Sequence, residues 1–164
     1  MAGSSTNIAA FPPRKPLLPA FAASDIFAGA LVQFVEPTSS STSPGMAVKM
    51  VTASTERPDG VAYADAAAGH PVTVYDAGEG PQVWAGGSVQ PGNYVGVSGT
   101  SEAAHPITGV KNKYPVLGVV SGASGTAVWA AGLAMLAANP NQKFTVLLKP
   151  TQLSTTNKYF GVAG

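Results

Sequence analysis

The chain has 164 residues, a formal net charge of +1 and 10% charged residues, against the roughly 25% of an average soluble domain. This length fits one compact domain, or two very small halves that share a core. The charge balance excludes the basic footprint of a nucleic-acid-binding protein, and the lack of cysteine excludes a disulfide scaffold and a cysteine metal site. A surface so poor in charge favours a protein that meets other protein over much of its area.

Residues 1–23 are predicted to form an extended N-terminal arm. Four prolines at positions 12, 13, 16 and 19 remove backbone donors and hold their neighbours in extended geometry. The same prolines interrupt the short apolar run, so we expect neither a signal peptide nor a membrane span, which needs about 20 apolar residues. The apolar side chains of the arm lead us to expect that it lies on a neighbouring protein.

The rest of the chain reads as short strands separated by glycine and proline turns. Strands are expected at residues 30–36, 46–52, 61–63, 70–75, 82–84 and 144–149, with three more between 86 and 130. The serine-rich stretch 37–45 is predicted to be a solvated hairpin tip. Residues 64–69 are interpreted as a helical turn or loop, and residues 131–138 as a short helix or a strand extension. The pattern predicts an all-β barrel or sandwich.

One strand phrase occurs twice. Residues 24–32 match residues 87–95, with Ile26 on Val89, Gly29 on Gly92 and Val32 on Val95. We also match residues 57–61 with 117–119, and 69–74 with 125–130. The chain is therefore predicted to hold a β domain at 24–150, made of two quasi-repeats at about 24–80 and 86–132, followed by a C-terminal tail at 151–164.

The sequence offers little for catalysis. His70 and His105 both precede proline at turns and are interpreted as exposed turn residues, and no nucleophile elbow accompanies them. The eight carboxylates are scattered over loops, and no metal-ligand spacing occurs. We therefore predict no enzyme activity, no metal and no cofactor. Trp84, Tyr94 and Trp129 form a possible subunit interface, although the two tryptophans can equally cap the core.

The phrase Val-Gln-Pro-Gly-Asn-Tyr-Val-Gly-Val at 89–97, with Pro-Val-Leu-Gly-Val-Val at 115–120 and Ala-Val-Trp-Ala-Ala-Gly at 127–132, resembles the head decoration (capsid cement) proteins of tailed bacteriophages. The segment Arg-Pro-Asp-Gly-Val at 57–61 is similar to the same family. The resemblance covers about residues 24–132. It implies a small β-barrel or β-tulip-like domain without catalytic activity, which sits on the outer surface of the virion shell.

The resemblance further implies a homotrimer that bridges neighbouring subunits of the major capsid protein. From the charge balance and the lack of a long apolar run we expect no nucleic acid or membrane as partner. The arm residues expected to contact the capsid are Ile8, Phe11, Pro12, Pro13, Arg14, Lys15, Leu17 and Leu18. An alternative hypothesis is a carbohydrate- or surface-binding β module, in which Trp84, Tyr94, Trp129 and Tyr159 would be the stacking platforms.

Overall fold

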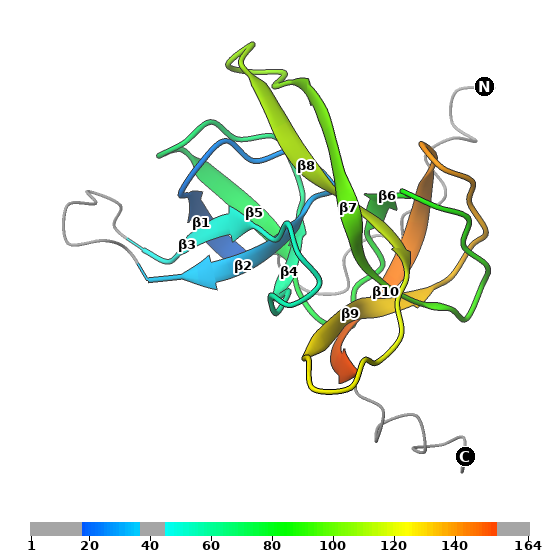
Figure 1. The fold of residues 1–164 in the computed structure, drawn as a ribbon. Helices are drawn as coiled ribbons and strands as arrows, with labels where there is room; N and C mark the ends of the chain where they lie inside the picture. The colour runs from blue at the N-terminus through cyan, green and yellow to red at the C-terminus, as the bar shows by residue number, and fades with distance from the viewer. Residues whose placement is uncertain (1–17, 37–44, 154–164) are drawn as a thin grey trace.

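The computed structural model describes residues 18–36 and 45–153, and within these ranges it contains strands and turns but no helix. The strands fall into two sets of five (Figure 1). The first set is β1 (Leu18–Ala22), β2 (Leu31–Val35), β3 (Ala47–Met50), β4 (Gly60–Ala62) and β5 (Pro71–Tyr75). The second set is β6 (Gln82–Trp84), β7 (Tyr94–Ala104), β8 (Lys111–Val119), β9 (Val128–Ala134) and β10 (Lys143–Leu153). The all-β, barrel-like class expected from the sequence is confirmed.

The first five strands close into a barrel in the order β1-β3-β2-β4-β5. Strand β1 completes the circle, because it pairs antiparallel with β5 and parallel with β3. In the second set the order is β6-β10-β9-β7-β8, and a parallel bridge between Ala85 and Leu117 joins its two ends. Both sets therefore have the same circular order of strands, and we call them barrel 1 and barrel 2.

The backbone hydrogen bonds show that the two barrels are copies of one unit. In barrel 1, Ile26 and Ala66 exchange both backbone bonds, and Gly29 N–H donates to Ala62 O. In barrel 2, Val89 and Ala138 exchange both bonds, and Gly92 N–H donates to Ala134 O. The same correspondence sets β1, β2, β3, β4 and β5 on β6, β7, β8, β9 and β10, so the predicted duplication is confirmed.

Each copy uses the same left-handed turn before its strands. Gly29, Gly69 and Gly92 have positive φ, and Asn141 takes the fourth place with a φ of 69°. Glycine is favoured there because it has no Cβ to clash, and asparagine is among the residues that tolerate this region best. The turns at Gly69 and Asn141 precede β5 and β10, which are therefore equivalent strands.

This equivalence corrects the second part of the sequence alignment. Residues 69–74 correspond to 141–146 and not to 125–130, since His70 O and Gln142 O accept the equivalent bonds from Ala22 N–H and Ala85 N–H. The copies begin at β1 and β6, before the limits drawn at 24 and 86; the first ends with β5, inside the limit of 80, and the second runs on through β10, past the limit of 132. Residues 64–69 form a bridge and a turn without a helix, and residues 131–138 continue β9 and then bridge to Val89.

Leu18 is part of barrel 1 and not of a free arm. Strand β1 pairs Leu18 with Val74 and Ala20 with Val72, so barrel 1 starts inside the stretch predicted to be an extended arm. Pro19 is tolerated because it pairs with Thr73 of β5 but has no partner on β3, whose pairing with β1 begins at Phe21. The other residues expected in the arm, up to Leu17, lie outside the described residues, as does the tip of the serine-rich loop.

Two apolar clusters fill the molecule. The interior of barrel 1 is built from small side chains: Ala20, Ala22, Ile26, Val32, Val48, Ala62, Ala66, Val72 and Val74. The equivalent nine positions of barrel 2 are Val83, Ala85, Val89, Val95, Leu117, Ala134, Ala138, Phe144 and Val146. This second cluster also includes four residues from the outside of barrel 1, namely Leu31, Val51, Val61 and Tyr75. The two barrels are therefore joined by a shared core.

Candidate assembly surfaces

The long hairpin of β7 and β8 binds barrel 2 to barrel 1 at its tip. His105 lies there with 1% of its surface exposed, and its Nε2 is 2.7 Å from Ile26 O. Its Nδ1 accepts hydrogen bonds from the backbone N–H groups of Ile107 and Thr108. Since a backbone N–H can only donate, this pattern places the ring proton on Nε2, which donates to Ile26 O. His105 is therefore a buried structural residue, and its interpretation as an exposed turn residue was wrong, whereas His70 is exposed.

Asp25 completes this contact from the side of barrel 1. Its Oδ2 accepts from Thr108 Oγ1 at 3.0 Å and from Asn112 Nδ2 at 3.1 Å, and its Oδ1 accepts from Ala68 N–H at 3.0 Å. The hydrogen bond from the Ala68 backbone, followed by those from the Thr108 and Asn112 side chains of the hairpin, holds the pKa of Asp25 below its ordinary value of 3.8 against the opposing effect of burial. The carboxylate thus links a turn of barrel 1 to the hairpin of barrel 2.

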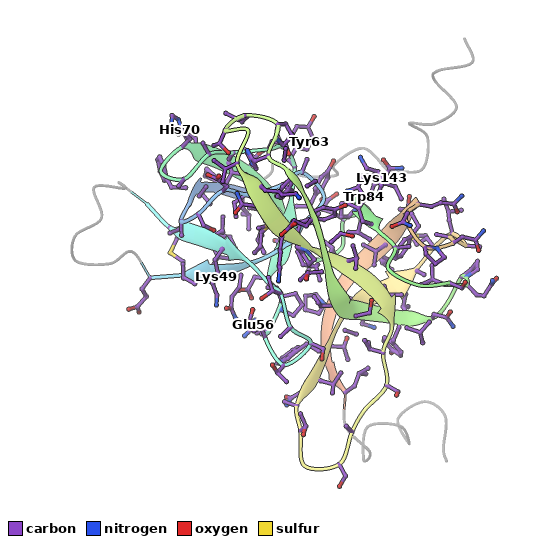
Figure 2. All side chains as sticks on the ribbon, turned by 45° about the horizontal axis from the view of Figure 1, so that its top comes forward. Lys49, Glu56, Tyr63, His70, Trp84 and Lys143 are labelled. Atoms are coloured by element: carbon purple, nitrogen blue, oxygen red, sulfur yellow. The ribbon has the colours of Figure 1, made fainter. Side chains whose placement is uncertain are left out.

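Trp84 and Trp129 both have partners within the chain. Lys143 Nζ lies 4.9 Å from the centre of the Trp84 ring (Figure 2), and Tyr114 lies beside the same ring with a centroid distance of 6.3 Å. Trp129 N–H donates to Ser54 O at 2.7 Å, and Arg57 Cζ lies 5.9 Å from the Trp129 ring. Part of each indole surface thus serves contacts inside the molecule, and their role at a subunit interface stays a prediction.

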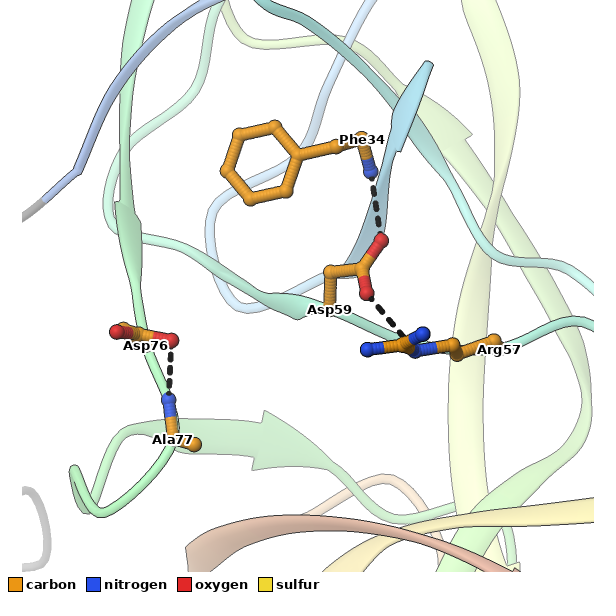
Figure 3. A network of polar contacts seen from close by, with 5 residues as sticks. All are labelled: Phe34, Arg57, Asp59, Asp76 and Ala77. Atoms are coloured by element: carbon orange, nitrogen blue, oxygen red, sulfur yellow. Dashed lines mark hydrogen bonds and ion pairs between the residues drawn. The ribbon is translucent and has the colours of Figure 1, made fainter.

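The Arg57 contact belongs to a short polar chain along barrel 1. Asp59 accepts from Phe34 N–H at 3.0 Å and pairs with Arg57 Nε at 3.2 Å (Figure 3). Because Arg57 also reaches Trp129 in β9, this chain forms a second polar contact between the barrels. Asp76, drawn in the same figure, accepts from Ala77 N–H at the start of the segment that joins the barrels.

Apolar side chains are exposed at several places outside these contacts. Tyr94, the third residue of the predicted interface, is 40% exposed and lies at the start of β7. The exposed large apolar residues are Met46, Tyr63, Tyr94, Ile107, Val110, Val119, Met135 and Leu136. Four of these, Tyr94, Val119, Met135 and Leu136, lie on β7 and β8 or directly after β9 in barrel 2. Of these eight residues, the sequence predicted only Tyr94 as an interface residue. The others could not be found from the sequence, because which side of a strand faces solvent depends on the segments that pack against it.

No metal-binding constellation forms among the described residues. No group of three or more histidines and carboxylates converges there to hold a metal ion. Nor does the described part of the chain contain a helix long and apolar enough to span a membrane. The described residues thus combine polar links inside the chain with apolar side chains on its surface.

No protein-family model matches the sequence, and no curated protein matches it. Among solved structures, the fold is similar to the head fiber gp8.5 N base of bacteriophage phi29, with a TM-score of 0.53 and 19% sequence identity. The match covers 85% of this chain and 98% of that chain, and so includes both barrels rather than one. The expected likeness to bacteriophage head proteins is thus confirmed at the level of the fold, which is similar to that of a phage head-fiber base.

Proposed function

We propose that this chain is a structural protein of a bacteriophage head, which binds the outer surface of the capsid and has no catalytic activity. The observation that carries this proposal is the fold-level match to a head-fiber base over nearly the whole of both chains. The independent resemblance of the strand phrases to capsid decoration proteins supports the same role. The low content of charged residues, 10%, agrees with a chain that is largely covered after assembly.

The finer part of the proposal concerns how the protein holds the capsid. A homotrimer bridges neighbouring major capsid protein subunits, and each chain contributes residues 1–17 as a contact segment. Apolar residues such as Phe11 and Leu17 fill pockets on the capsid, and Arg14 and Lys15 meet acidic groups there. Three such segments on one trimer raise the overall affinity through effective concentration.

The test is co-sedimentation with undecorated capsids of the cognate phage, comparing the full chain with a variant that lacks residues 2–17. The deletion must end before Leu18, because β1 closes barrel 1. We expect saturable binding at fixed stoichiometry for the full chain, and a loss of about tenfold or more for the deletion, equivalent to about 1.4 kcal/mol. A variant that lacks residues 154–164 is the matched control and is expected to bind normally.

The outcomes separate the parts of the proposal. Full binding by the deletion variant removes the arm from the mechanism but leaves the capsid role intact. Failure of the full chain to bind capsids contradicts the capsid role itself. A polysaccharide titration tests the alternative of a carbohydrate-binding module, and saturable binding that is lost in Trp84→Ala would favour it.

A further inference from the structure

The duplication gives every surface of barrel 2 an equivalent surface on barrel 1. On barrel 1, Leu31, Val51, Val61 and Tyr75 point away from the barrel interior, and all four are buried in the apolar cluster shared with barrel 2. The equivalent positions in barrel 2 are Tyr94, Val120, Leu133 and Leu147, which we call the open face. Tyr94 is 40% exposed, and the other three are each partly exposed.

The open face is continuous across β7, β9 and β10 and the residue that follows β8. Leu133 lies directly opposite Tyr94 on one side and Leu147 on the other, so the three side chains project from the same side of the sheet. Val120 N–H donates to Tyr94 O, and the Val120 side chain lies against Gly96, which is on the same side as Tyr94. In barrel 1, Val51 N–H donates to Leu31 O in the same way.

The margins of the open face are also apolar. Met135 follows Leu133 on the same side and is 38% exposed, at the position equivalent to Tyr63, which packs on Tyr75 in barrel 1. A shallow, mainly apolar depression continues from Leu147 to Pro150, and Ala77 and Gly78 form its other wall. The four positions of the open face carry no charge, and the nearest charged groups on β10 are Lys143 and Lys149, on either side of Leu147.

We propose that the open face packs against the same face of a second copy of this chain. The chain already buries the equivalent face of barrel 1 against barrel 2, so an apolar face at this place on the unit does support contact with another copy of the unit. Exposed continuous apolar patches are typical of such protein interfaces. The inference deepens the proposed function, since it rests on the self-association of that proposal and names the surface responsible.

The open face of one chain could meet either the open face of a second copy or the surface of barrel 1 that is equivalent to its internal partner on barrel 2. The geometry favours the contact between two open faces. In the shared cluster, barrel 2 contributes its nine interior positions and three further residues, Val97, Ala131 and Leu148. The equivalents on barrel 1 are Phe34, Asp59 and Asp76, so two of the three are carboxylates with polar partners (Figure 3). An apolar face would gain little from that surface, because the carboxylates would lose water. In a homotrimer the three open faces instead meet at the threefold axis.

The chain contains no cysteine, which allows a direct test by site-specific cross-linking. Leu133→Cys in the full chain is expected to form a covalent dimer with a short bismaleimide reagent at micromolar concentration. The control is Ile107→Cys, at an equally apolar but 60% exposed turn position at the hairpin tip, which is expected to remain uncross-linked. Cross-linking at both sites, or at neither, overturns the assignment.

Light scattering after size exclusion provides the second readout. The unmodified chain and Ile107→Glu are expected to be oligomers, whereas Leu133→Glu and the more exposed Tyr94→Glu are expected to be folded monomers. Circular dichroism confirms folding, and Tyr94→Glu keeps the test valid if Leu133→Glu unfolds. A folded Tyr94→Glu that stays oligomeric contradicts the inference. A chain that oligomerises through this face but does not bind capsids refutes the capsid role and leaves the inference standing. A monomeric chain that binds capsids refutes the inference and the homotrimer, and leaves the capsid role standing.

Discussion

Barrel 1 and barrel 2 share a backbone frame but differ in what surrounds it. The interior of barrel 2 is larger, because Val83, Leu117 and Phe144 replace Ala20, Val48 and Val72. Barrel 1 is closed by ladders on both sides of β1, whereas one bridge closes barrel 2. One outer face is buried inside the chain in barrel 1 and left open in barrel 2. The comparison shows that a duplicated unit keeps its hydrogen bonds while its packing adapts to its neighbours.

The largest expected effect comes from truncating one buried side chain in the interior of each barrel and comparing the two losses in unfolding free energy. Phe144→Ala is expected to lower the free energy of unfolding by about 3–5 kcal/mol, because a fully buried ring leaves a cavity. The equivalent Val72→Ala is expected to cost about 2 kcal/mol, since it removes fewer buried carbon atoms. Urea unfolding followed by circular dichroism measures both. Equal losses of unfolding free energy would contradict the conclusion that barrel 2 has the larger interior.

A pair of equivalent glycines tests the shared frame itself. A Cβ on Gly132 would collide with Leu147 O, and a Cβ on Gly60 would collide with Tyr75 O, at the same place in each barrel. We expect Gly132→Ala and Gly60→Ala each to lower the free energy of unfolding by about 1–3 kcal/mol through overpacking. Gly87→Ala is the control, because nothing lies within 4 Å of its Cβ position. A neutral Gly132→Ala would show that β9 and β10 can separate without cost.

The hairpin contact can be weakened without touching either interior. His105→Phe keeps a ring at the site but removes the hydrogen bond to Ile26 O, which still accepts from Ala66 N–H. It also takes the Nδ1 acceptor from the Ile107 and Thr108 N–H groups, so we expect a loss of about 1–3 kcal/mol in unfolding free energy. Hydrogen exchange of the amides at 105–110 is expected to accelerate more than exchange in β9 or β10. The exposed His70→Phe is the matched control. Unchanged exchange in His105→Phe would mean that the hairpin tip is held without the hydrogen bonds of His105.

The smallest expected effect is a pH dependence of the same contact. The pKa of Asp25 is lowered in the folded chain, so its stabilising contribution is present above the ordinary pKa of 3.8 and is lost as the pH falls through the lowered value. Asp25→Asn is expected to reduce the slope of stability against pH below about pH 4, as measured by thermal unfolding at several pH values. Asp76→Asn, a carboxylate outside the hairpin contact, serves as the control. Identical acid profiles for Asp25→Asn and the unmodified chain would exclude this role.

Local sequence signals located the strands and the first part of the repeat. The match of Ile26, Gly29 and Val32 with Val89, Gly92 and Val95 is correct because a left-handed glycine turn fixes both the bridge before it and the strand after it. The later match failed because asparagine replaces glycine in the fourth turn, at Asn141, while Gly125 has the same positive φ in an unrelated turn. A longer hairpin in the second copy also shifted the register between the copies.

What the sequence determined by itself was the β class, the turns and the existence of two copies, since these depend on residues close together in the chain. Tertiary structure alone decided that Leu18 belongs to a barrel, that His105 is buried and that Tyr94 lies on an open face. Each of these depends on a partner far away in the sequence: Val74 for Leu18, Ile26 for His105 and Leu133 for Tyr94. Periodicity shows that a strand has two faces, but only packing decides which face is covered.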